Sequence, residues 1–256
     1  MHRGKESTGY ESFGVKLRSG TGDMPDPSGV RLCAMTDTII VAGTDSPEAA
    51  PLVAELDLEY ASRYEDYEGF ARDEDAPEEL DLFPPLVFEQ PLGTLLLVRR
   101  DGQTVAGGAF MYLDEETAEV KRVWTSSSHR REGLSRRVMA ALEAAAADRG
   151  YRRIYLTTGP RQPEAVGLYR SLGYTPLFDL DANWEDIAHL AFEKELQGRS
   201  PGPGVSERVG PELADRAARQ RAAVAATYRW RERPAVRLGG VDRPEHRSRG
   251  TAVPAE

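Results

Sequence analysis

The fold is decided by the stretch Val120–Gly150, which reads VKRVWTSSSHRREGLSRRVMAALEAAAADRG. Its start at 120–125 predicts a strand, the serines that follow predict a turn, and the alanine- and leucine-rich remainder predicts a helix that ends at Gly150. The first N–H groups of a helix lack intrahelical partners and carry the positive end of the helix dipole. We therefore expect a phosphate-binding site where the loop meets the helix.

The residues of the loop agree with this expectation. Gly133 permits a tight turn and a close approach of the backbone to a ligand. The basic residues around the helix start are Arg130, Arg131, Arg136 and Arg137. The chain contains no G-x-x-x-x-G-K-[ST], and no G-x-G-x-x-G follows a strand, which argues against the two familiar nucleotide-binding loops. The remaining pattern, R-x-x-G-x-S, taken alone also fits a solvated turn.

Two motifs carry a family resemblance. R-x-x-G-x-S closely resembles the [QR]-x-x-G-x-[GA] signature of the GCN5-related N-acetyltransferase (GNAT) family, with Arg130 first, Gly133 fourth and Ser135 sixth. Ser135 departs from the usual Gly or Ala. The segment AVGLYRSLGY at 165–174 resembles the A-x-x-L-Y-x-x-x-G-[FY] element of the family, with Gln162 at a position where Asn is common.

Periodicity and turn residues predict further elements along the chain. The predicted strands are 38–42, 93–100 and 103–113 about a turn at Asp101-Gly102, 117–125, 153–158 and 189–196, the last resembling the closing strand of the family. The predicted helices are one capped by Asp45 or Ser46 with Pro47 in its first turn, one at 133–149, and one that starts at Gln162-Pro163 and ends at Gly173. Strand alternation places Glu119, Lys121 and Val123 on one face and Val120, Arg122 and Trp124 on the other. The resemblance implies a mixed α/β (α+β) fold whose mostly antiparallel central sheet is splayed and flanked by helices.

Composition divides the chain into three parts. Residues 1–34 read as a disordered extension, 35–196 as the GNAT domain, and 197–256 as a Gly/Pro linker, an alanine-rich helix at 211–226 and a largely disordered Arg-rich tail. The net charge of -9 argues against a generic nucleic-acid binder, although the tail leaves that alternative open. The lack of a membrane-length apolar run and of a signal-peptide core predicts a cytoplasmic protein. The single cysteine, Cys33, provides no disulfide and no obvious acyl-carrying nucleophile.

The segment 45–89 is strongly acidic, with fifteen Asp and Glu against two Arg. A solvated helical face is one explanation. In GNAT-like folds this region lines the acceptor site, so its carboxylates would attract a cationic amine. The aromatic residues of the region could form walls of that site or belong to the core: Tyr60, Tyr64, Tyr67 and Phe70.

The resemblance also implies the site residues. The cofactor acetyl-CoA, a co-substrate here, would be bound by the strand end and the phosphate loop, namely Val123, Trp124, Thr125, Arg130, Arg131, Glu132, Gly133, Leu134 and Ser135, with Gln162 as a further contact. Tyr169 matches the tyrosine that protonates the departing thiolate in many members. Glu119 is the candidate general base, a water chain being the alternative, and no residue is assigned to a metal.

These observations predict an N-acetyltransferase that moves the acetyl group of acetyl-CoA directly to a primary amine of a small cationic acceptor. The alternative is a non-catalytic acyl-CoA-binding sensor or interaction module. The expected partner is a small-molecule amine, without a membrane or nucleic acid. The acceptor's identity and the oligomeric state, a homodimer included, are left open by the sequence.

Overall fold

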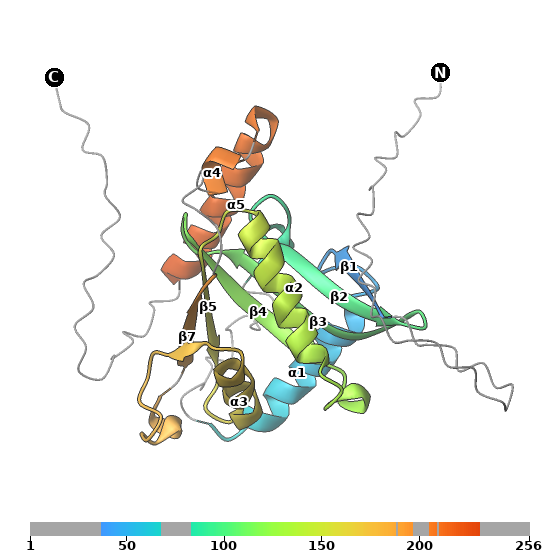
Figure 1. The fold of residues 1–256 in the computed structure, drawn as a ribbon, viewed down its shortest axis with the longest axis vertical. Coiled ribbons are helices and arrows are strands. Elements are labelled where there is room, and N and C mark those ends of the chain that lie inside the picture. The colour runs from blue at the N-terminus through green and yellow to red at the C-terminus, as the bar shows by residue number, and fades with distance from the viewer. Residues whose placement is uncertain (1–36, 68–82, 188, 197–204, 209, 231–256) are drawn as a thin grey trace, which may run out of the picture.

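The computed structural model describes residues 37–67, 83–187, 189–196, 205–208 and 210–230 (Figure 1). The predicted N-terminal extension with Cys33, the aromatic Phe70, the Gly/Pro linker and the end of the Arg-rich tail lie outside these ranges. Within them, no helix is long and apolar enough to cross a membrane.

A single seven-stranded sheet organises the fold, in the order β1-β2-β3-β4-β5-β7-β6. The strands are β1 (Thr38–Ala42), β2 (Thr94–Arg100), β3 (Gln103–Tyr112), β4 (Thr117–Thr125), β5 (Arg153–Thr158), β6 (Thr175–Pro176) and β7 (Leu190–Glu195). Every neighbouring pair is antiparallel except β4 and β5. The mixed α/β, mostly antiparallel fold predicted from the sequence is therefore confirmed, while the short strand β6 was not predicted.

The helices lie on both sides of this sheet (Figure 1). They are α1 (Ala50–Tyr64), α2 (Leu134–Asp148), α3 (Pro163–Ser171), α4 (Val205–Arg208) and α5 (Pro211–Trp230), with 3-10 turns η2 (Pro85–Phe88), η3 (Ser127–His129) and η4 (Trp184–Asp186). One buried cluster, the α2-side cluster, contains Leu134, Val138, Met139 and Leu142 of α2 and Val166 and Tyr169 of α3. The other, the α1-side cluster, contains Leu52 and Leu56 of α1, Val87 and Phe88 of η2, and Trp124. The sheet thus separates two apolar layers.

Strands β4 and β5 pair over only part of their length. Their register runs from Thr117 opposite Arg153 to Val120 opposite Leu156, and these two described strands then continue without a further pair. The predicted splay at the centre of the sheet is present. It opens a space between β4 beyond Val120 and β5 beyond Leu156.

The hairpin of β2 and β3 follows from local chemistry. Asp101 and Gly102 both have positive φ, 49° and 82°, which is the geometry of a two-residue type I′ turn. The paired ends Arg100 and Gln103 close directly on this turn. The Asp-Gly prediction is confirmed to the residue.

A bulge in β4 changes the predicted alternation of side chains. Trp124 pairs with Gly107 but Lys121 pairs with Ala109, and Arg122 has a φ of 57°. The extra residue shifts the period. Lys121 lies over the Phe83 ring on the α1 side, whereas Val123 packs with the α2-side cluster. The prediction that Lys121 and Val123 share a face of the sheet was wrong. The prediction that Val120 and Trp124 share the other face was also wrong, since Val120 belongs to the α2-side cluster and Trp124 to the α1-side cluster. The polarity of the sequence does not reveal an inserted residue in a strand.

The start of α1 also differs from the prediction. Residues from Gly43 to Ala49 form consecutive turns, with Ser46 N–H donating to Gly43 O at 3.2 Å and Ala49 N–H donating to Ser46 O at 3.0 Å. The helix begins at Ala50, with a proline, Pro51, in its first turn and no side-chain cap. Neither Asp45 nor Ser46 caps it. Thr104 holds the preceding turn instead, by donating its hydroxyl to Glu48 O at 2.7 Å.

Two glycines of β3 let α1 and α2 approach the sheet closely. A Cβ placed on Gly107 would lie 2.8 Å from Leu52 of α1, and one on Gly108 would lie 3.0 Å from both Val138 and Leu142 of α2. These two neighbouring positions face opposite sides of the sheet. Each helix therefore rests on a site where no side chain intervenes.

Helix α5 packs into the fold rather than extending from it. Ala217 belongs to the α2-side cluster and Val224 to the α1-side cluster. Gln220 is fully buried; its Nε2 donates to Leu86 O and Glu89 O, both at 2.7 Å. The sequence ended the domain at residue 196, but the buried core continues into this helix. The alanine-rich pattern predicted the helix but not its docking surface.

Candidate active site

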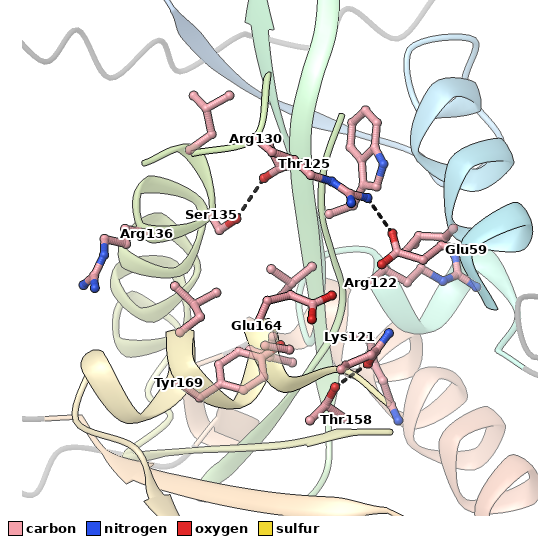
Figure 2. Close-up of a pocket in the computed structure, with 18 of the residues that line it drawn as sticks. Glu59, Lys121, Arg122, Thr125, Arg130, Ser135, Arg136, Thr158, Glu164 and Tyr169 are labelled. Atoms are coloured by element: carbon pink, nitrogen blue, oxygen red, sulfur yellow. Dashed lines mark hydrogen bonds and ion pairs between the residues drawn. The ribbon is translucent and has the colours of Figure 1, made fainter. Parts of the chain in front are cut away.

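A cavity of about 550 Å³ lies where β4 and β5 diverge (Figure 2). Its walls come from α1, from β4 between Val120 and Thr125, from the loop and first turn of α2, from the end of β5, and from α3. It therefore connects the α2 side of the sheet to the α1 side. A ligand in this cavity would contact the free edge of β4, whose amides no longer pair with β5.

The loop before α2 has the geometry that the sequence predicted. Arg131 and Gly133 both have positive φ, 68° and 79°. The first helical hydrogen bond from this turn is donated by Arg137 N–H to Gly133 O at 3.2 Å, so the preceding amides are the open N–H groups of the helix start. A Cβ on Gly133 would meet no atom within 4 Å. The loop and helix start thus form an open concave surface of N–H donors that suits an anion.

Ser135 connects this loop to the neighbouring strand. Its Oγ shares a hydrogen bond of 2.9 Å with Thr125 Oγ1 (Figure 2). The departure from Gly or Ala at this motif position therefore has a structural use, because the bond fixes the helix start against the end of β4. Both residues line the cavity.

The cavity is predominantly cationic. Among the described residues that line it, five are basic and two are acidic. The basic residues are Lys121, Arg122, Arg130, Arg131 and Arg136, and the acidic ones are Glu59 and Glu164. This balance favours a phosphate-bearing ligand at the loop end.

Most of the predicted cofactor residues come together here. The residues that line the cavity are Val123, Trp124, Thr125, Arg130, Arg131, Gly133, Leu134, Ser135 and Gln162. Glu132 does not: its carboxylate accepts a 2.5 Å hydrogen bond from Arg100 Nη1, and this guanidinium lowers the pKa of Glu132. Arg100 also binds Asp37 at 2.6 Å. Glu132 therefore holds the outside of the loop.

Gln162 is turned toward the end of β5. Its Oε1 accepts hydrogen bonds from Thr158 Oγ1 and, at 3.3 Å, from Gly159 N–H. The side chain thus fastens the β5–α3 turn, while the residue still borders the cavity. This arrangement gives the residue a structural role in addition to the predicted ligand contact.

Tyr169 lies on the cavity wall with most of its ring buried. The ring packs against Phe192 and Tyr174, with centroid distances of 5.5 and 5.8 Å, and the residue is 6% exposed. Burial raises the pKa of the Tyr169 phenol. A phenol held in its protonated form can donate a proton at neutral pH.

Glu119 occupies a different position from the one expected of a base in contact with substrate. Its side chain is 3% exposed, and its Oε1 lies 2.9 Å from Lys121 Nζ. Its buried Oε2 has no hydrogen-bond partner in the described ranges. Lys121 lines the cavity and Glu119 does not. The carboxylate therefore stands one side chain behind the cavity wall.

Helix α1 supplies carboxylates that the sequence could not place. Glu55 Oε2 accepts from Trp124 Nε1 and from Ser127 N–H, both at 3.1 Å, and so connects the helix to the loop that follows β4. Glu59 lines the cavity and accepts from Arg130 at 2.9 Å. The acidic residues of this helix thus face basic and polar groups instead of solvent alone.

The aromatic residues of this region divide between cavity and packing. Tyr60 lines the cavity. Tyr67 is buried, donates its hydroxyl to Glu185 O at 2.8 Å and packs against Tyr64 at a centroid distance of 5.7 Å. Of the predicted aromatic residues that the structure describes, Tyr60 lines the cavity, while its role as a wall of the acceptor site stays a prediction.

Comparison with known proteins agrees with this geometry. The chain is similar to the Bacillus subtilis (strain 168) protein named "Uncharacterized N-acetyltransferase YsnE", with 38% identity over 77 residues, which are 29% of this chain and 51% of that protein. The chain thus spans about half the length of the curated relative that it matches.

Similar solved structures cover more of the chain at lower identity. A protein of Klebsiella pneumoniae subsp. pneumoniae MGH 78578 assigned as an acyl-CoA N-acyltransferase is 27% identical, with 63% of this chain and 98% of that chain covered and a TM-score of 0.49. An acetyltransferase from Streptococcus agalactiae 2603 is 20% identical, with 62% and 98% covered and a TM-score of 0.46.

The family model for "Acetyltransferase (GNAT) family" matches residues 56–174. The matched segment begins at Leu56 within α1 and ends at Tyr174, just after α3. It includes the diverging strands, the loop at Gly133 and Tyr169. Residues 56–174 of the chain are thus similar to the acetyltransferase (GNAT) family.

Proposed function

We propose that this protein transfers the acetyl group of acetyl-CoA directly to a primary amine. The observation that carries the proposal is the cavity that passes between β4 and β5 with an anion-binding loop at one end and Tyr169 in its wall. The family uses acyl-CoA, and the choice of acetyl-CoA is part of the proposal. The cytoplasmic location and the oligomeric state stay predictions.

The residues present fit this co-substrate. The loop amides beyond Gly133 would bind the pyrophosphate, with Arg131 and Arg136 providing positive charge. The free edge of β4 at Val123, Trp124 and Thr125 would bind the pantetheine arm and donate to the thioester carbonyl oxygen. Acetyl-CoA supplies the activated acetyl group.

Proton transfer would use two sides of the cavity. Tyr169 would give its proton to the departing thiolate. Burial raises the pKa of the phenol, which keeps it protonated at neutral pH but also makes it a weaker acid. Removal of a proton from the attacking amine would use Glu119 through Lys121, or a water chain. Because Glu119 stands behind the wall, direct contact with the amine would require displacement of the Lys121 side chain.

The acceptor would enter from the α1 side. Glu59, Tyr60 and Phe83 line this part of the cavity and offer one carboxylate between aromatic surfaces. We propose a small amine that carries positive charge. The acidic character of 45–89 supports this choice through long-range attraction.

The proposal is tested by calorimetric titration of acetyl-CoA into the full chain and into the variant Gly133→Glu. The variant places a carboxylate in the open concave surface, so we expect acetyl-CoA binding to be lost. Gly102→Glu is a matched control, because Gly102 also has positive φ (82°) and open space around its Cα but lies in the β2–β3 turn. If the folded wild type does not bind, or if both variants bind as well as the wild type, the cofactor assignment is wrong.

A screen of primary amines for CoA release then tests transfer itself. Release that depends on an amine supports the transferase. Acetyl-CoA binding without turnover by any amine would favour the non-catalytic acyl-CoA-binding module.

A further inference from the structure

The motif residue Arg130 is engaged by helix α1. Its Nη2 donates to Glu59 Oε2 at 2.9 Å, and its side chain is 48% exposed. Figure 2 shows this side chain reaching from the loop toward α1. The residue that heads the phosphate-binding motif is thus paired with a carboxylate of the acceptor side.

Glu59 is held at both oxygens. Its Oε1 lies 2.8 Å from Arg63 Nη2, and Arg63 also pairs with Glu164. If Arg130 moved away, Glu59 would keep its ion pair with Arg63, whose guanidinium also pairs with Glu164. A carboxylate in that state, 22% exposed and lining the cavity, would be available to a second cation.

We propose that Glu59 binds the positive charge of the acceptor amine and that its ion pair with Arg130 keeps it occupied until the co-substrate arrives. The pyrophosphate and Glu59 compete for Arg130. A doubly charged pyrophosphate beside the loop amides is the stronger partner for a half-exposed guanidinium, so Arg130 turns from α1 to the phosphate. Co-substrate binding thereby releases Glu59 toward the acceptor. This inference rests on the proposed function and adds a named residue and a coupling to it.

The coupling can be measured with CoA before an acceptor is known. We expect Glu59→Gln to tighten CoA by about two- to fivefold, since the variant removes an exposed ion pair that competes for Arg130. In the Arg130→Ala background there is no pair to break, so the same change should have little effect. Pantetheine, which lacks the pyrophosphate, should bind equally to wild type and Glu59→Gln.

A matched control separates competition from simple charge repulsion. Glu164→Gln removes the same charge from the same cavity, at a residue that pairs with Arg63 and not with Arg130. Because Arg63 also pairs with Glu59, a small dependence on Arg130 is expected, but one well below that of Glu59→Gln. If Glu59→Gln tightens CoA as much or more in the Arg130→Ala background, repulsion explains the effect and the coupling is wrong. No change in CoA affinity on Glu59→Gln also overturns it.

Steady-state kinetics with the first amine found to be acetylated test the role of Glu59 in binding the acceptor. Glu59→Gln should raise the KM of that amine while lowering the Kd of CoA. A role limited to folding would weaken both, and that result would refute the assignment. Failure of the wild type to bind CoA would instead refute the proposed function, so the two failures are distinguishable.

Discussion

Replacement of Gln220 by leucine should destabilise the protein strongly, although the residue lies on the C-terminal helix. Its amide is fully buried and serves the backbone of the segment that carries η2. Nε2 donates to Leu86 O and Glu89 O, both at 2.7 Å, and Oε1 accepts from Leu92 N–H at 3.2 Å. Leucine fills a similar volume but leaves the buried Leu92 N–H without its partner. It also removes one hydrogen bond each from Leu86 O and Glu89 O, which still accept from Glu89 N–H and Gly93 N–H.

The magnitude follows from those three bonds. The unsatisfied Leu92 N–H costs about 1 to 3 kcal/mol, each of the other two lost bonds costs about 0.5 to 1 kcal/mol, and the added apolar burial offsets part of the sum. We expect the free energy of unfolding to fall by about 2 to 4 kcal/mol. For a chain of this size that corresponds to a Tm lower by roughly 6 to 12 °C.

Thermal and urea denaturation followed by circular dichroism measure this change. Arg219→Ala is the control, because Arg219 neighbours Gln220 on the same helix but is exposed; its effect should stay within about 0.5 kcal/mol. A Gln220→Leu Tm within 2 °C or so of the wild type would refute the reasoning, since that is less than the loss of one such bond.

Three further predictions concern the site and the first strand. Glu55→Ala should weaken acetyl-CoA binding by about tenfold in calorimetry, because the loop after β4 loses its bonds from Trp124 Nε1 and Ser127 N–H; unchanged affinity would show that the loop is held without α1. Tyr169→Phe should lower kcat by about 10²-fold with CoA affinity retained, and because burial raises the pKa of this phenol, the wild-type kcat should show no loss attributable to Tyr169 ionisation up to about pH 10; equal kcat values would remove Tyr169 from the chemistry. Hydrogen bonds from Arg100 lower the pKa of Asp37, so the stability that Asp37 contributes is present above its unfolded value of about 3.9 and is lost as the pH falls through the lower folded value. Asp37→Asn should therefore destabilise at pH 7, and the difference from the wild type should shrink as the pH falls below about 3.9. A pH-independent difference in urea unfolding would contradict this.

Local chemistry explains what the sequence could predict. Asp101-Gly102 specifies its turn by the two residues alone. The arginine- and glycine-containing loop before a helix predicts an anion site from its own residues, and the structure gives this loop an open backbone at Gly133. The start of α1 was misplaced because Thr104, far along the chain, fixes the turn before it. Local signals therefore located elements and motifs, while distant contacts set some of their boundaries.

The remaining features depend on contacts between segments that are distant in sequence. The bulge at Arg122 depends on the register with β3, which polarity does not encode. The position of Glu119 behind Lys121 follows from packing around Phe83. The Glu59–Arg130 pair joins residues 71 positions apart. A periodic pattern of apolar residues predicts which face of a helix or strand is buried, but it does not predict which other segment packs against that face.

The adjacent glycines Gly107 and Gly108 of β3 help to set how far α1 and α2 lie from the sheet. Gly107 sets how close α1 lies to the sheet, and Gly108 does the same for α2. Helix α1 carries the residues proposed for the acceptor side, and α2 begins at the loop proposed to bind phosphate. One dipeptide therefore affects the spacing between the two proposed substrate positions. A methyl group added at Gly107 would press on Leu52 of α1 and also on Leu97 and Leu96 O of β2, whereas one added at Gly108 would press on Val138 and Leu142 of α2. The proposed acceptor side and the proposed co-substrate side of the cavity therefore depend on two adjacent glycines that contact different helices.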